Sequence, residues 1–264
     1  MTTKDRPCAL ITGASGGIGE ALARELASQG HDLILVARSV DALDALGAEL
    51  AGQHGITATS MGADLAEVGA GRALAAALES RGLSVDVLVN NAGFADFGEF
   101  ATADLDKTMQ MLTLNIATLT ELTHELLGPM LERGSGRVMN VASTAAFLPG
   151  PLMAAYYATK AYVLSFSEGI AEELKGTGVT VTALCPGPTT SGFQARAAME
   201  DSKLVKGKKI MDASTVAKIG VAAMMVGKPL VICGFKNKVL AAMPRFLPRA
   251  MVPGMVKRGQ SAGH

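Results

Sequence analysis

The stretch Cys8-Ala-Leu-Ile-Thr-Gly-Ala-Ser-Gly-Gly-Ile-Gly19 decides the fold of this chain. Its first residues form a short apolar run typical of a buried strand, and the glycines that follow mark a tight turn. The next residues, 20–28, have the pattern of a helix. A strand that passes through a glycine-rich turn into a helix begins a βαβ unit, so we predict a parallel sheet flanked by helices.

Short apolar runs alternate with helix-patterned segments along the rest of the chain. The runs are continuously apolar, as expected of strands that helices cover on both faces. No internal repeat and no low-complexity linker marks a second domain, so we expect residues 1–264 to form one domain. The predicted strands are Cys8–Ile11, Asp32–Val36, Thr57–Gly62, Val85–Val89, Gly136–Val141, Thr180–Cys185 and Leu230–Cys233.

Composition narrows the possible functions. Hydrophobic residues make up 49% of the chain, charged residues make up 18%, and the formal net charge is zero, which gives no electrostatic reason to expect nucleic acid. No apolar run of about 18 residues lacks a charge, so a transmembrane helix is not expected. The polar start, residues 1–7, leads straight into a strand, which predicts no secretory signal and a cytoplasmic site of action.

The glycine turn also predicts a ligand. Glycines there let the backbone approach a pyrophosphate, and the N–H groups and dipole of the helix start attract it. Such a turn by itself usually means only a tight bend, but the strand before it and the helix after it favour a dinucleotide site. The predicted contacts in the turn are Gly13, Ser15, Gly17, Ile18 and Gly19.

The end of the second strand bears on which dinucleotide binds. Ala37 stands where an acid would hold the ribose hydroxyls of NAD, and Arg38-Ser39 follows. An arginine beside a missing acid suits a 2′-phosphate, so NADP(H) is favoured, although Arg38 alone could equally be a solvated loop charge. Asp64, after the third strand, could accept a hydrogen bond from adenine or cap the following helix.

A tyrosine and a lysine carry the catalytic prediction. Tyr156 and Lys160 are four residues apart in a helical segment, so they share one face, and the cation is expected to favour the phenolate. Ser143 follows the strand-like run 137–142, where a hydroxyl would emerge at a strand end. A surface helix pair would explain the tyrosine and lysine alone, but the serine and the glycine turn make a proton-transfer centre the better interpretation.

Taken together, these motifs resemble the short-chain dehydrogenases/reductases over about residues 7–235, and within them bacterial members akin to 17β-hydroxysteroid dehydrogenases and 3-oxoacyl reductases. The resemblance implies a Rossmann-type doubly wound α/β fold with a seven-stranded parallel sheet, a nicotinamide cofactor, and a homodimer or homotetramer. It also implies a centre of Ser143, Tyr156 and Lys160, with Asn115 assisting. Further implied cofactor contacts are Asp64, Leu65, Asn91, Ala92, Gly93, Tyr156, Lys160, Pro186, Gly187 and Thr189.

Other reactive side chains have simpler interpretations. The three cysteines, Cys8, Cys185 and Cys233, lie in apolar runs without C-x-x-C pairing, so we expect buried, inert thiols. The four histidines are scattered, so neither a metal site nor a histidine-based triad is predicted.

Two segments outside these motifs remain. Residues 188–214 leave the sheet beside the expected nicotinamide site, and Phe193 and Met199 there suggest a lid over an apolar substrate. The C-terminal tail, residues 236–264, carries six basic residues, no acid and many apolar residues. It could lie on an anionic membrane surface. An amphipathic helix pair that covers the pocket or a subunit contact is preferred, because prolines 244, 248 and 253 interrupt any long helix.

The leading hypothesis is an NADP(H)-dependent reductase of an apolar ketone, aldehyde or acyl-type substrate. The alternative is a catalytically silent sensor or scaffold that binds NADP. Turnover of a panel of carbonyl compounds discriminates between the two.

Overall fold

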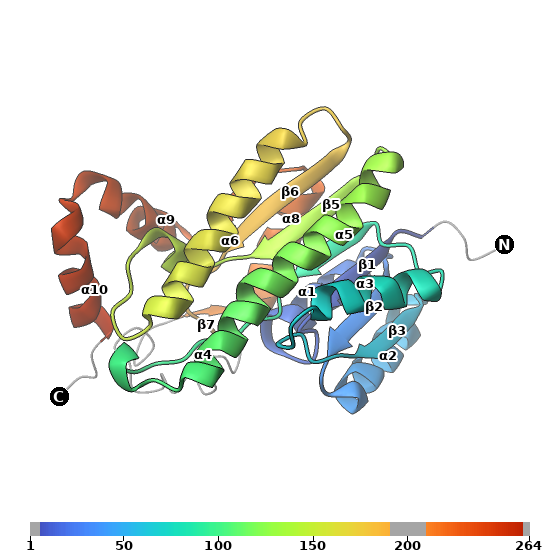
Figure 1. Ribbon diagram of the computed structural model, residues 1–264. Coiled ribbons are helices and arrows are strands. Elements are labelled where there is room, and N and C mark those ends of the chain that lie inside the picture. The colour runs from blue at the N-terminus through green and yellow to red at the C-terminus, as the bar shows by residue number, and fades with distance from the viewer. Residues whose placement is uncertain (1–5, 191–209, 261–264) are drawn as a thin grey trace.

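A computed structural model describes residues 6–190 and 210–260 of the chain. Its centre is a seven-stranded parallel sheet with the strand order β3-β2-β1-β4-β5-β6-β9 (Figure 1). The order runs outward from β1 in both directions, which makes the sheet doubly wound and confirms the predicted fold class. Its strands are β1 Cys8–Thr12, β2 Asp32–Ala37, β3 Ala58–Gly62, β4 Val87–Asn90, β5 Gly136–Val141, β6 Val179–Cys185 and β9 Leu230–Ile232.

Helices cover both faces of the sheet and extend beyond one end of it (Figure 1). The helices are α1 Gly17–Ser28, α2 Val40–His54, α3 Ala70–Ser80, α4 Leu105–Leu112, α5 Leu119–Glu132, α6 Ala154–Glu173, α8 Ala213–Met225, α9 Phe235–Ala242 and α10 Val252–Gln260. Short helical turns are η1 Phe100–Thr102, η2 Thr113–Thr118, η3 Thr144–Phe147, η4 Met243–Phe246 and η5 Arg249–Met251.

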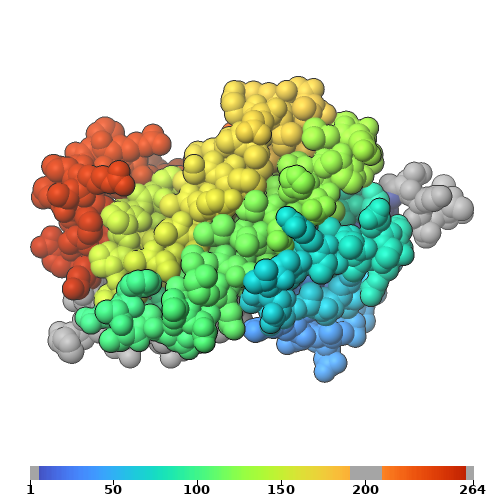
Figure 2. Space-filling view, in the orientation of Figure 1, coloured from blue at the N-terminus to red at the C-terminus, as the bar shows by residue number. Residues whose placement is uncertain are grey.

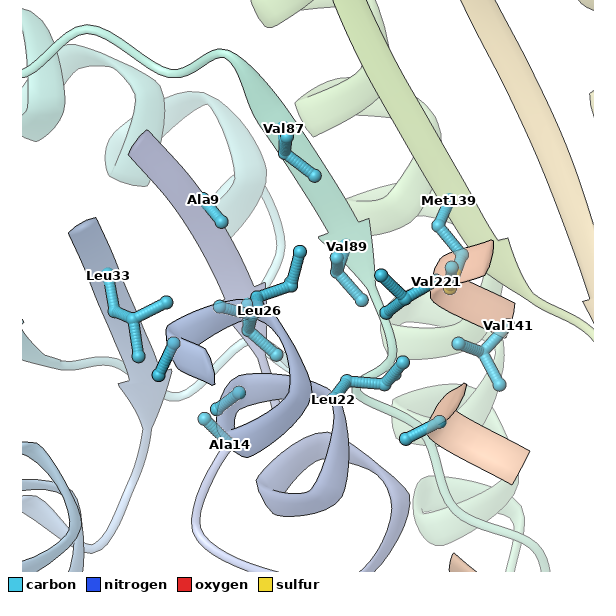
Figure 3. Packing of buried hydrophobic residues seen from close by; sticks show 14 of the residues in the cluster. Ala9, Ala14, Leu22, Leu26, Leu33, Val87, Val89, Met139, Val141 and Val221 are labelled. Carbon is cyan, nitrogen blue, oxygen red and sulfur yellow. The ribbon is translucent and has the colours of Figure 1, made fainter. Parts of the chain in front are cut away.

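Alternate residues of the strands enter two separate cores. Ile11 and Val89 pack with Leu22 and Leu26 of α1 and with Val221 of α8 on one face (Figure 3). The neighbouring strand residues, Leu10, Leu88 and Val138 among them, pack on the other face against α3, α5 and α6. Because both faces of the central strands are buried, these strands are mainly apolar, which is why apolar runs predicted them.

The structure corrects several predicted boundaries. The fourth strand begins at Val87 rather than Val85, since its ladder with β1 starts at that residue. The helical stretch 105–132 is three elements, because a π-helical turn, η2, separates α4 from α5. The stretch 188–214, expected to be a lid, contains the paired two-residue strands β7 Thr189–Thr190 and β8 Met211–Asp212. Two residues are too few to show a sequence period.

Two of the three thiols are buried as predicted. Cys185 and Cys233 are buried, and Cys8 is half-buried. Burial raises the pKa of Cys185 to about 12 and that of Cys233 to about 11, so both thiols stay protonated at neutral pH. Within residues 6–190 and 210–260, no helix combines the length and the apolar content that crossing a bilayer requires.

Candidate active site

The glycine turn between β1 and α1 forms one end of the site. Gly13 has φ of 66°, a left-handed conformation that favours glycine, and its N–H donates to the carbonyl of Val36 at 2.8 Å. A side chain at Gly19 would collide with the carbonyl of Gly13. Helix α1 starts after Gly16, and no side chain caps its first turn. The N–H groups of that turn can therefore bind an anion.

The loop after β4 forms the adjoining wall. Asn91 Nδ2 donates to the carbonyls of Thr12 at 2.9 Å and Gly13 at 3.2 Å, and the N–H of Ala92 donates to Thr12 Oγ1 at 3.0 Å. These bonds fix the ends of β1 and β4 against each other. Asn90 is 3% exposed and bonds Asn140 and Thr123 inside the protein, so it supports the wall rather than forming its surface.

Polar side chains follow β2 and β3 at the end of the site beyond the glycine turn. Arg38 Nη1 lies 4.0 Å from Asp64 Oδ2, and the Arg38 side chain is 78% exposed. Ser39 stands at the N-terminus of α2 but does not cap it with its side chain. Asp64 Oδ1 accepts from the N–H of Ala66, and since α3 begins only at residue 70, Asp64 closes a local turn instead of capping that helix.

The expected catalytic side chains converge beside the ends of β5 and β6. Ser143 follows β5, and its Oγ accepts from the N–H of Ala145 at 3.1 Å and forms a hydrogen bond with Tyr156. Tyr156 and Lys160 lie one turn apart on α6 and are 8% and 6% exposed. Lys160 Nζ donates to the carbonyl of Val141 at 2.7 Å and lies 5.9 Å from the centre of the Tyr156 ring. The end of β5 and helix α6 thus supply one cluster.

Burial shifts the pKa values of Tyr156 and Lys160, and the shift of Tyr156 is opposite to the expected direction. Burial raises the pKa of the Tyr156 phenol above its usual range, and the hydrogen bond with Ser143 only partly opposes this. The shift is thus upward, whereas the lysine was expected to lower the tyrosine pKa. Burial lowers the pKa of Lys160 to about 8. Lys160 therefore loses its proton more readily than an exposed lysine does. Its Nζ donates to the Val141 carbonyl rather than to the phenol.

Asn115 lies deeper than its residue type suggested. An asparagine in a helix usually marks a solvated face, but Asn115 is 1% exposed and lies in the π-helical turn η2. Its side chain accepts from the N–H of Phe94 at 3.2 Å and donates to the Phe94 carbonyl and to Thr159 Oγ1. A Cβ atom at Gly93 would come within 2.9 Å of Asn115 Oδ1 and 3.7 Å of Lys160 Nζ. Asn115 thus joins the β4 loop to α6 just behind Lys160.

The loop after β6 closes the site from the opposite side. The carbonyl of Pro186 accepts from the N–H of Thr144 at 2.9 Å, and Thr189 Oγ1 donates to the Gly187 carbonyl at 2.9 Å. A side chain at Gly187 would collide with Asn237 of α9. The tail is therefore packed directly against this loop.

One cavity of about 800 Å³ lies between these elements. Of the residues predicted from the sequence, Gly17, Gly19 and Asn115 do not line it, whereas the other predicted residues do. Gly17 and Gly19 belong to the glycine turn. Asn115 lies behind the cavity wall, where it joins the β4 loop to α6. The predicted lid residues Phe193 and Met199 lie outside the described residues.

The apolar lining could be predicted only in part. The tail was expected to cover the pocket, and its residues Leu240, Met243, Val252, Met255 and Val256 do line the cavity. Sequence reasoning missed Phe94, Leu148 and Met153, which share no spacing. In the part of the chain that the structure describes, no three His, Cys, Asp or Glu side chains are placed to hold a metal ion.

Comparison with known proteins places this site in context. Residues 7–201 match the family model of short chain dehydrogenases. A very-long-chain 3-oxoacyl-CoA reductase of Anas platyrhynchos is 38% identical over 183 residues, which cover 67% of this chain and 58% of that protein. A putative ketoacyl reductase of Streptomyces coelicolor is 39% identical over 191 residues, covering 71% of this chain and 72% of that protein.

The duck reductase is thus matched over less than two thirds of its own length. Among solved structures, a short-chain dehydrogenase from Sphingobium yanoikuyae in complex with NADPH superposes with a TM-score of 0.81 at 31% identity, over 91% of this chain and 93% of that one. By the family match, the sequence identities and the shared fold, this chain belongs to the short-chain dehydrogenase family.

Proposed function

We propose that this chain is an NADP(H)-dependent oxidoreductase that interconverts an apolar ketone, aldehyde or acyl-type carbonyl compound and its alcohol. The observation that carries the proposal is that one cavity is lined by the glycine turn, by Arg38, and by Ser143, Tyr156 and Lys160. A nucleotide site and a proton-transfer centre within one cavity are what hydride exchange between a nicotinamide and a carbonyl needs.

The residues present fit the dinucleotide. The uncapped first turn of α1 would hold the pyrophosphate, and the glycine at position 13 leaves room for it. Arg38 and Ser39 would hold the 2′-phosphate, since the Ser39 hydroxyl does not cap α2 and no acid stands at Ala37. Lys160 would bind the ribose hydroxyls near the nicotinamide. When bound, the reduced cofactor supplies a hydride.

Side chains of the protein would bind and protonate the carbonyl oxygen of the substrate. Ser143 Oγ would donate a hydrogen bond to that oxygen, and Tyr156 Oη would give it a proton as the alcohol forms. The raised pKa of Tyr156 keeps the phenol protonated, which suits a proton donor in the reduction direction. Asn115 would hold the β4 loop and α6 in register and link Lys160 to solvent.

The lining supports an apolar substrate. Beyond Tyr156 the cavity is walled by Leu148, Met153 and Tyr157, and the tail adds Met243 and Val256. The names of the relatives from duck and Streptomyces refer to oxoacyl and ketoacyl reduction, in keeping with this class. We place the protein in the cytoplasm as a homo-oligomer, and a measurement of its mass in solution tests the second part.

Turnover of a series of straight-chain ketones tests the proposed activity. Because each buried methylene contributes about 0.8 kcal/mol, kcat/KM should rise about fourfold per added CH₂ until the cavity is filled. The measurement is the loss of NADPH absorbance, with small hydroxylated ketones as the polar comparison. Tight NADPH binding without turnover of any carbonyl compound would instead support the silent sensor or scaffold.

Cofactor preference tests the assignment of Arg38. We expect the unmodified protein to bind NADPH at least about tenfold more tightly than NADH, equivalent to about 1.4 kcal/mol. Arg38→Asp should reverse that order, because a carboxylate repels the 2′-phosphate and can accept from ribose hydroxyls. Fluorescence titration of both cofactors measures this, and Arg72→Asp, on the exposed surface of α3, is the matched control. Equal affinities in the unmodified protein would refute the assignment.

A further inference from the structure

The charge of this chain is divided unevenly along its length. Residues 1–212 carry 16 basic and 24 acidic side chains, whereas residues 213–264 carry eight basic side chains and no acidic one. The net charge of zero conceals this separation. Six of the eight cations lie in the C-terminal tail, and each is exposed: Lys236, Lys238, Arg245, Arg249, Lys257 and Arg258.

Large apolar side chains are exposed among these cations. Phe235 and Phe246 are 80% and 85% exposed, and Val239 and Met251 are 54% and 56% exposed. Phe235 and Val239 are four residues apart, so they share one face of α9. Together with the six cations, these four residues form what we call the tail surface. Large apolar side chains that stay exposed among cations indicate a site of contact with a protein or a membrane.

Other side chains of the tail line the cavity. Leu240 and Met243 line the cavity, as do Val252, Met255 and Val256. The tail segments lie together at one end of the molecule, away from the α1 to α3 region (Figures 1 and 2). The two roles considered for the tail, a cavity wall and a membrane contact, are thus compatible, because different side chains serve them.

We propose that the tail surface docks on an anionic lipid bilayer, with Phe235 and Phe246 among the acyl chains and the cations at the headgroups. Charge complementarity favours this partner, because segments that combine basic residues with exposed Phe and Leu bind the interface of anionic membranes. The tail would lie on the membrane without spanning it. Docking does not depend on the proposed activity, but it would set the cavity wall against a reservoir of apolar molecules.

Two other occupants fit the tail surface less well. A second copy bound through a two-fold axis would place the same surface on itself and bring the cations face to face. A small soluble anion would satisfy the cations but leave Phe235 and Phe246 in water. A bilayer accommodates both the charge and the apolar side chains.

Sedimentation of the full chain with lipid vesicles tests the proposal. At about 0.01 M ionic strength the protein should sediment with phosphatidylcholine vesicles that contain phosphatidylglycerol, and much less with phosphatidylcholine alone. It should be released at about 1 M, where the Debye length falls from about 30 Å to about 3 Å. Failure to sediment with the anionic vesicles at low ionic strength would overturn the proposal, whatever the outcome of the turnover assays.

Matched charge variants separate the tail surface from general charge effects. Lys238→Gln, Arg245→Gln and Arg249→Gln combined should lower vesicle partitioning roughly a hundredfold, since each cation near the surface contributes about fivefold. The control combines Arg72→Gln, Arg81→Gln and Lys175→Gln, three exposed cations outside the tail with the same change in net charge. Equal losses in the two triple variants would overturn the proposal.

Apolar variants distinguish the bilayer from a second copy. Phe235→Ser with Phe246→Ser should lower vesicle partitioning at least about tenfold and leave the mass in solution unchanged. The control is Val68→Ser with Phe100→Ser, which removes exposed apolar side chains far from the tail in sequence. If the tail pair instead lowered the mass in solution, the surface would be a subunit contact and the proposal would be wrong.

Discussion

Replacing Tyr156 by phenylalanine should lower kcat for carbonyl reduction by at least about a hundredfold, because a positioned proton donor contributes about 10² to 10⁴ in rate. Phenylalanine keeps the buried ring, which meets the Tyr157 ring edge-on at a centroid distance of 6.1 Å, and removes only the hydroxyl. The dissociation constant for NADPH should change little, since that ligand's expected contacts are spread over the glycine turn and Arg38. Single-turnover kinetics and a fluorescence titration measure the two quantities.

Tyr157→Phe is the matched control for this prediction. Tyr156 and Tyr157 are adjacent in α6, both line the cavity and each is 8% exposed, but only Tyr156 has a lysine four residues later. We expect Tyr157→Phe to alter KM more than kcat, as loss of a packing contact does. If Tyr156→Phe retained a rate within about tenfold of the unmodified protein, Tyr156 would not be the proton donor.

The sheet could be predicted from the sequence because short segments of the chain carry the pattern of each strand. The central strands are buried on both faces, so they appear as continuous apolar runs, as in Leu33–Val36. The glycine turn could be recognised because the backbone at Gly13 and the close approach at Gly19 both require glycine. The predicted strand ends were less accurate, because the neighbouring strand determines where pairing begins. Strand β4 starts at Val87, which pairs with Ala9 of β1.

The candidate site was only partly predictable, because long-range contacts complete it. Asn115 was expected on a helix, but its burial depends on Phe94 and Thr159, which lie 21 and 44 residues away. Nothing near Asn115 in the sequence signals the π-helical turn that contains it. The tail's part in the cavity likewise depends on how Asn237 packs against Gly187. The environment that shifts the pKa of Lys160 also comes from the assembled fold.

Replacing Lys160 by methionine should stabilise the ligand-free protein near neutral pH while lowering its turnover. Burial lowers the pKa of Lys160 from 10.5 to about 8, so below about pH 8 the fold holds an ammonium that the unfolded chain hydrates better. At 1.36 kcal/mol per pKa unit, that penalty is about 3 kcal/mol. Methionine has a similar length and no charge, but it loses the hydrogen bond to Val141, worth about 1 kcal/mol. We expect a net gain of roughly 2 kcal/mol in the free energy of unfolding, measured by urea denaturation at about pH 7.

The pH dependence gives this prediction a sign that packing alone would not produce. Between about pH 8 and pH 10.5 the unfolded chain binds the Lys160 proton and the folded protein does not, so the lysine's penalty disappears as pH rises. The advantage of Lys160→Met should therefore shrink over this window and become a deficit once the lysine is neutral and still bonded to Val141. Taking the difference between variant and unmodified protein cancels the titration of the cysteines and Tyr156. Lys175→Met, an exposed lysine just beyond α6, controls for removing a lysine as such. If Lys160→Met destabilised the protein equally at about pH 7 and pH 10, burial would not penalise this ammonium. The protein would then not give up free energy of unfolding to keep Lys160 in the site.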